Sequence, residues 1–299
     1  MVLDPKHTRQ IRIDAVGGPV DLSGRTIGVS MPCPGCRYDL RGVPATSHCP
    51  ECGLDITQVL ASAVDPTVHR LPPLASPRAV GDGIVLTSLA LASGVVLPVV
   101  GVLWAGAATV SGQMGVSTPV MESLTTLAAV LVATTGLAGC WSLKPRGAGP
   151  LQQVARRAVV LCATGCLLMV GGLVSVLIEG SWFMIGGLLA AGGGLMTSLA
   201  GLRAVLLEAG RRCRAFRTAT IQRQRITPLL LATALASLAL PASRVADMAG
   251  QQTIVLTLGA IGLIAASMLA VGLIYLVNNA IWIRRALRQP PPRLTELLD

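Results

Sequence analysis

Residues 83–121 contain no charged side chain, and this stretch most restricts what the chain can fold into. A transmembrane helix needs about 20 consecutive apolar residues, so the stretch is long enough for one membrane span, a polar turn near Ser111–Gln113 and the start of a second span. Lipid cannot satisfy open backbone groups, so we expect helices. The apolar runs are continuous rather than alternating, which excludes a β-barrel.

The rest of the chain repeats this pattern. Hydrophobic residues make up 52% of its 299 residues and charged residues 13%, about half the share that is usual in soluble domains. The expected fold is therefore an all-α membrane bundle of about six transmembrane helices. The expected spans lie at residues 83–105, 120–142, 158–178, 182–202, 226–243 and 253–276.

The positive charges predict the orientation of this bundle. With six spans, 23 of the 24 Lys and Arg residues fall in the two termini and in the loops after spans 2 and 4, and only Arg244 falls elsewhere. The positive-inside rule then places both termini in the cytoplasm and the spans in the cytoplasmic membrane. Residues 203–225 hold seven arginines, which we expect to bind anionic lipid.

Two Cys-x-x-Cys pairs precede the spans: Cys33 with Cys36, and Cys49 with Cys52. Zn²⁺ takes four such ligands in tetrahedral geometry, and the cytosol keeps thiols reduced. The four cysteines therefore predict one structural Zn²⁺. A redox iron site, two disulfides and two redox-active pairs remain alternatives, whereas His48 is not counted as a ligand because four cysteines complete the shell.

The cysteines also define the expected domain order. A polar segment (1–30), with a short strand at Ile11–Val16, precedes a zinc ribbon (31–56), which we expect to form a β-hairpin with knuckles. A short helix is expected at residues 54–64, and the segment 57–82 that follows the ribbon holds most of this helix and a Pro-rich linker with Pro66, Pro72, Pro73 and Pro77. The transmembrane domain (83–283) and a basic, Pro-rich cytoplasmic tail (284–299) complete the chain.

The sequence from Cys33 to Gly42 (CPGCRYDLRG), followed by Cys49-Pro-Glu-Cys-Gly53, resembles the N-terminal zinc ribbon of a group of uncharacterised bacterial multi-pass membrane proteins. Arg37 stands where that group usually has glycine. The resemblance implies zinc at Cys33, Cys36, Cys49 and Cys52, and it implies no known activity.

No catalytic constellation is present, so we do not expect an enzyme. The ribbon is slightly acidic, which argues against nucleic acid and favours a structural module or one that binds a cytosolic protein. A small-solute transporter or channel regulated by the ribbon is the alternative, and a membrane redox protein with iron is a further one. Glu122 and Glu179 are expected at the outer ends of spans, and Cys140, Cys162 and Cys166 are expected to serve packing.

Overall fold

The computed structural model of the chain describes residues 21–64, 71, 74, 76–110, 114–144, 151–178, 180–213, 216–217, 226–289 and 292–299. The chain divides into two compact units. Unit 1 combines Met1–Leu74, Arg211–Arg214 and Gln289–Asp299, and unit 2 combines Ala75–Gly210 with Ala215–Arg288. The domain that precedes the first span therefore also includes the last residues of the chain.

Unit 2 contains six long apolar helices among the described residues, and each is long and apolar enough to cross a membrane. This confirms the expected membrane helices. They are α3 (Pro77–Val110), α4 (Met114–Leu143), α5 (Leu151–Val176), α6 (Ser181–Gly210), α8 (Thr227–Met248) and α9 (Gln252–Arg288).

All six helices are longer than the expected spans. Pro77, expected in the linker, is the first residue of α3, a position where proline is well accepted because its missing N–H has no helical partner there. α9 continues 12 residues past the expected end of its span, to Arg288. α6 continues eight residues past the expected end of its span, to Gly210, where a Cβ would meet the Phe216 ring.

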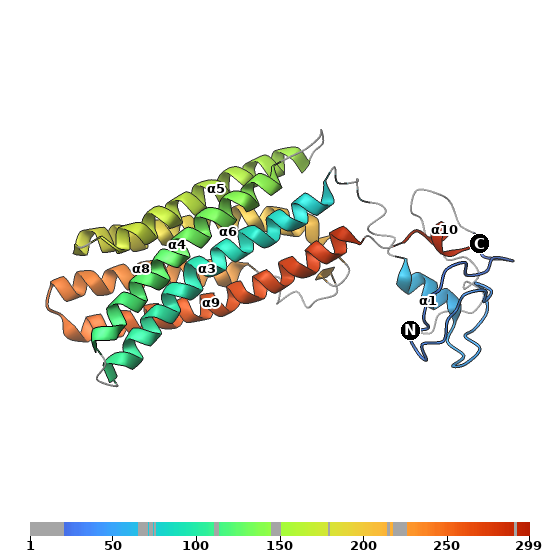
Figure 1. Ribbon diagram of the computed structural model, residues 1–299, viewed down its shortest axis with the longest axis horizontal. Coiled ribbons are helices and arrows are strands. Elements are labelled where there is room, and N and C mark those ends of the chain that lie inside the picture. Colours follow the sequence, from blue (N-terminus) through green and yellow to red (C-terminus); the bar gives the residue numbers. More distant parts are fainter. Residues whose placement is uncertain are drawn as a thin grey trace. The chain divides into compact units, whose positions relative to one another are not determined.

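The six helices run side by side (Figure 1), and their contacts form a ring that follows their order in the sequence. Each packs mainly against its neighbours in the sequence, and α9 returns to pack against α3. Asp82 of α3 accepts hydrogen bonds from Arg284 Nε (2.5 Å) and Arg288 Nη2 (2.9 Å) of α9, which closes the ring with charged side chains. Large apolar side chains such as Leu256, Met268 and Leu231 point outward, as expected of a surface that contacts lipid.

Glycines set the close contacts inside this ring, as small residues commonly do between membrane helices. A Cβ on Gly194 of α6 would lie 2.5 Å from the Gly165 carbonyl oxygen of α5. About two turns further along α5, a Cβ on Gly172 would lie 2.5 Å from the Gly187 carbonyl oxygen of α6. The α5–α6 hairpin therefore packs backbone to backbone, with no room for side chains at these two levels.

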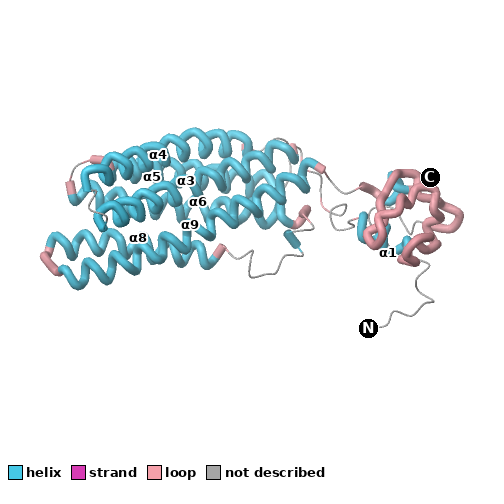
Figure 2. The backbone as a smooth tube through the Cα atoms, turned by 60° about the horizontal axis from the view of Figure 1, so that its bottom comes forward, coloured by secondary structure: helices cyan, strands magenta, loops and turns pink. Residues whose placement is uncertain are grey.

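Unit 1 consists mostly of turns and loops, with α1 (Ile56–Ala63) and the single-turn α10 (Leu294–Leu297) (Figure 2). Asp55 caps α1 by accepting a hydrogen bond from the Thr57 N–H, and the helix lies where the sequence predicts one. A single apolar cluster, which includes Ile27, Leu40, Ile56 and Leu60, forms its core.

The expected β-hairpin is not found in the part of unit 1 that the structure describes. Pairing there is limited to four isolated antiparallel bridges, between Thr26 and Pro44, Ile27 and Leu298, Pro32 and Asp39, and His48 and Asp55. The turns around the two cysteine pairs occupy the residues that longer strands would need. The expected strand at residues 11–16 and Pro66, Pro72 and Pro73 of the linker lie outside the described residues.

Candidate metal centre

The two cysteine pairs form two turns with the same backbone hydrogen bonds. In the first turn, the N–H of Arg37 donates to the Cys33 oxygen (2.8 Å) and the N–H of Cys33 donates to the Tyr38 oxygen (2.8 Å). In the second, the N–H of Gly53 donates to the Cys49 oxygen (2.9 Å), and Cys49 donates to Leu54 (2.8 Å). Each turn therefore fixes its two cysteines by the same pattern, displaced by 16 residues.

The residues of the two turns repeat as well. CPGCRYDL (33–40) and CPECGLDI (49–56) match at both cysteines, at the proline and at the aspartate, and both end in an aliphatic residue. Leu40 and Ile56, at those last positions, are both fully buried in the core of unit 1. Sequence reasoning overlooked this eight-residue repeat, which is visible in the printed chain and assigns Asp39 and Asp55 to equivalent structural positions.

Both aspartates hold their turns through backbone N–H groups. The Asp39 carboxylate accepts hydrogen bonds from the N–H groups of Met31 (3.1 Å) and Arg41 (3.2 Å). Donation by the Arg41 N–H and by the Ser30 hydroxyl holds the pKa of Asp39 below its usual value. Asp55 accepts from the N–H of Thr57 (2.8 Å). The residues that follow each cysteine turn are thus held in place by hydrogen bonds to the carboxylate of Asp39 or of Asp55.

The four sulfur atoms converge on one point. All four Sγ atoms of Cys33, Cys36, Cys49 and Cys52 lie within 4.8 Å of one another. The Sγ atoms of Cys33 and Cys52, and those of Cys36 and Cys49, are 3.6 Å apart. Four sulfurs at about 2.3 Å from a tetrahedral Zn²⁺ would lie about 3.8 Å from one another, whereas a disulfide needs about 2.05 Å. The arrangement fits one metal ion and contains no disulfide.

The surroundings of the sulfurs favour a bound cation. Burial raises the pKa of Cys33, but N–H groups of Cys36 and Gly35 donate to its sulfur, and the pKa falls to about 7. The N–H of Tyr38 lowers the pKa of Cys36, but desolvation and the neighbouring thiol of Cys49 outweigh it, and the pKa rises to about 12. Thiolates this close repel one another, and a dication among them removes that repulsion.

Cys33 and Cys49 are buried, whereas Cys36 and Cys52 are exposed. Each turn therefore supplies one ligand from the core and one from the surface. Among the described residues, the metal-binding group consists of these four cysteines alone, and His48 is not part of it. All four predicted site residues are thus brought together.

The three cysteines of the spans have a different environment. Cys140, Cys162 and Cys166 are buried within unit 2, and they do not form a metal-binding group in the described chain. The Cys162 thiol donates to the Ser198 carbonyl oxygen (3.6 Å), and the Ser198 hydroxyl donates to the Cys162 carbonyl oxygen (3.4 Å). These contacts join α5 to α6, which agrees with a packing role.

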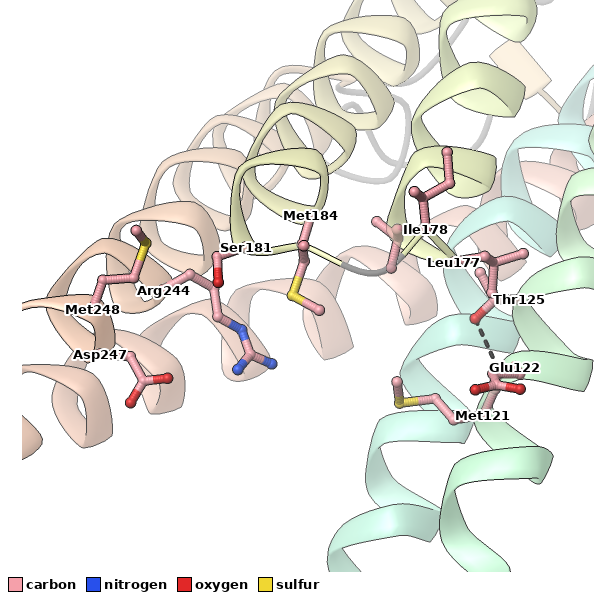
Figure 3. A pocket seen from close by; sticks show the side chains of 12 residues that line it. Met121, Glu122, Thr125, Leu177, Ile178, Ser181, Met184, Arg244, Asp247 and Met248 are labelled. Carbon is pink, nitrogen blue, oxygen red and sulfur yellow. Dashed lines mark hydrogen bonds between the residues drawn. The ribbon is translucent and has the colours of Figure 1, made fainter.

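A pocket of about 330 Å³ lies at the end of unit 2 where α5 turns into α6 (Figure 3). Its charged side chains are Glu122 of α4 and Arg244 and Asp247 of α8, and all three are exposed. Glu122 thus lies near the start of the membrane-capable segment Pro119–Leu143, as expected, whereas Glu179 lies outside the described residues. The hydroxyl residues Thr125 and Ser181 also line the pocket, together with methionine and aliphatic side chains.

Comparison of the chain with protein-family models, with curated proteins and with solved structures gives no match.

Proposed function

We propose that this chain is a multi-pass protein of the bacterial cytoplasmic membrane that carries one structural Zn²⁺ in a cytosolic domain. Cys33, Cys36, Cys49 and Cys52 are the ligands, and unit 1 acts as a structural or protein-interaction module rather than as an enzyme. The observation that carries the proposal is the convergence of the four Sγ atoms within 4.8 Å of one another.

Zinc is preferred because the site has the features of a closed structural centre. Four protein thiolates fill a tetrahedral shell and leave no position for water or substrate, unlike catalytic zinc sites, which have three protein ligands. Zinc binding then contributes directly to folding. This suits unit 1, whose described residues form little regular secondary structure.

The assignment of unit 1 to the cytosol rests on two independent observations. Unit 1 combines residues from before α3, from after α9 and from the loop after α6, which supports a location of both chain ends on the same side of the membrane. That agrees with an even number of spans, and six helices are long enough to cross. The distribution of 23 of the 24 basic residues selects the cytoplasmic side, where reduced thiols are available for a metal.

A transporter or channel is the weaker candidate. A moving or conducting bundle would be supported by polar side chains facing a mid-membrane cavity. Asn278, a polar residue of α9, is exposed. The α5–α6 hairpin packs on glycine backbones, and the pocket with charged residues lies at a helix end.

The test is the metal content of full-length protein purified in mild detergent without added metal. We expect one zinc per chain, and loss of that zinc in Cys36→Ser. The matched control is Cys140→Ser, which removes a buried thiol of α4 outside the site and should keep one zinc. Iron, recognised by a visible chromophore, would support the redox alternative, and absence of any metal from the wild-type chain would contradict both assignments.

A further inference from the structure

The last seven residues of the chain form part of unit 1 through backbone pairing. The N–H of Gly28 donates to the Leu297 oxygen (2.9 Å), and the N–H of Asp299 donates to the Thr26 oxygen (3.0 Å). These two bonds enclose an antiparallel bridge between Ile27 and Leu298. The C-terminal segment Arg293–Asp299 therefore adds to the edge of residues 26–28 as a short strand would.

Three leucines of the segment complete the core that surrounds the metal ligands. Leu294, Leu297 and Leu298 are 6%, 6% and 8% exposed, and they belong to the same apolar cluster as Cys33 and Cys49. Thr295 and Glu296, between them, are exposed. The pattern shows that one face of the segment is buried in unit 1 and the other faces outward.

The edge that receives the segment is held in place by the loop between the two metal turns. The N–H of Ile27 donates to the Val43 oxygen (3.0 Å), and the N–H of Gly42 donates to the Ile27 oxygen (2.7 Å). Val43 belongs to the loop that joins Cys36 to Cys49, so both of its ends are fixed by metal ligands. Residues 26–28 thus lie between two segments: the C-terminal segment on one side and the loop between the metal turns on the other. A metal bound to the four cysteines would fix both ends of that loop.

We propose that zinc binding creates a docking site for the chain's own C-terminal segment, so that metal loading and docking are coupled. The inference rests on the proposed zinc site. Its occupant is Arg293–Asp299, which is joined to α9 by residues 289–292. In the zinc-loaded protein the end of the last span is thereby tied to the domain that precedes the first span, and removal of zinc releases it.

Coupling of this kind is reciprocal. If bound zinc makes the docking free energy of the segment more favourable, the docked segment must make the binding free energy of zinc more favourable by the same amount. The first experiment therefore measures zinc affinity of the full-length protein in detergent by competition with a chromogenic chelator. We expect the double variant Leu297→Ala/Leu298→Ala to bind zinc at least about tenfold more weakly, within the usual range of coupling between sites. Thr295→Ala, an exposed position in the same segment, should leave the affinity unchanged.

The second experiment needs no variant. Hydrogen exchange of the wild-type chain, read by mass spectrometry on the C-terminal peptide, should show the amides of the docked segment protected with zinc, above all that of Asp299, which donates to the Thr26 oxygen. After chelation these amides should exchange at least about tenfold faster, within the same range of coupling, while peptides from the middle of α9 keep their protection. This measurement remains decisive if the double variant fails to fold.

The outcomes separate the two proposals. Wild-type protein without zinc contradicts the proposed function. Wild-type protein that holds one zinc, but whose C-terminal amides stay protected after chelation, overturns the coupling and leaves the zinc site intact. Equal zinc affinity of the double variant and the wild-type chain does the same.

Discussion

Arg37 and Gly53 occupy the same place in the two metal turns, and both have a left-handed backbone, with φ of +67° and +70°. The group that the sequence resembles usually has glycine where Arg37 stands, yet the hydrogen bonds of the first turn match those of the second. The hydrogen bonds of the turn thus impose the left-handed conformation on Arg37, although this region of φ and ψ normally favours glycine. The cost of this conformation for a side-chain-bearing residue is about 1–2 kcal/mol.

This gives a matched pair of predictions at the residue scale. Arg37→Gly should stabilise zinc-loaded unit 1 by up to about 1 kcal/mol, since relief of the left-handed conformation is partly offset by the greater chain entropy of glycine. Gly53→Arg should destabilise it by a similar amount. The midpoint of thermal zinc release measures both changes. A lower midpoint for Arg37→Gly would mean that the arginine side chain contributes a contact that outweighs its strain.

At the scale of elements, close packing of glycines determines how α5 and α6 meet. A Cβ on Gly194 would lie 2.5 Å from the Gly165 oxygen and 2.7 Å from the Met169 nitrogen. These are backbone atoms, which cannot turn away as a flexible side chain can. The neighbouring Gly193 faces open space, with no atom within 4 Å of its Cβ position.

Gly194→Ala should therefore lower the free energy of unfolding of the bundle by about 1–3 kcal/mol, the usual cost of overpacking. Gly193→Ala, on the same helix, should leave stability unchanged or raise it slightly, because alanine is the better helix former. Thermal unfolding in detergent, compared between the two variants, is the measurement. Equal effects of the two changes would show that the α5–α6 contact is looser than described.

The contact between α3 and α9 has an electrostatic part that can be tested separately. Asp82 binds Arg284 and Arg288, with side chains 33%, 36% and 45% exposed. At such exposure an ion pair contributes at most about 1 kcal/mol and weakens as salt is added.

Asp82→Asn should accordingly lower the thermal midpoint in low salt and have less effect at high salt. The control is Arg285→Gln, because Arg285 is exposed and makes no ion pair within the described chain. If both variants behave alike at both salt concentrations, the ring is closed by apolar packing of α3 against α9 rather than by this pair.

At the scale of the whole molecule, the two chain ends combine into one unit while the six helices form another. If all six helices cross, the even number of crossings puts both ends on one side of the membrane and the turn between α8 and α9 on the other. Gln251, in that turn, is exposed and offers a position for a probe.

In intact cells, a membrane-impermeant maleimide should label Gln251→Cys and leave the wild-type chain unlabelled. After permeabilisation and zinc removal, the wild-type chain should also react, because Cys36 and Cys52 are exposed. Labelling of wild-type cysteines in intact cells would reverse the orientation inferred from the basic residues.

Features encoded in composition and short spacing were predictable. The six membrane helices follow from local apolar runs, because lipid leaves each run only helical hydrogen bonding to satisfy its own backbone. The four cysteines follow from two local pairs, each fixed by a turn of its own residues. The β-hairpin was the error, because the bonds of those turns replace the strand pairing that it requires.

The sequence by itself thus determined that this protein has helices able to cross a membrane and which four cysteines are brought together, since both depend on residues close in the chain. The tertiary structure alone decided that the helices close into a ring and that Leu294, Leu297 and Leu298 complete the core around residues 22–64. Such contacts join residues more than 200 positions apart. Their free energy depends on which surfaces meet after the chain has folded, and no local pattern specifies that.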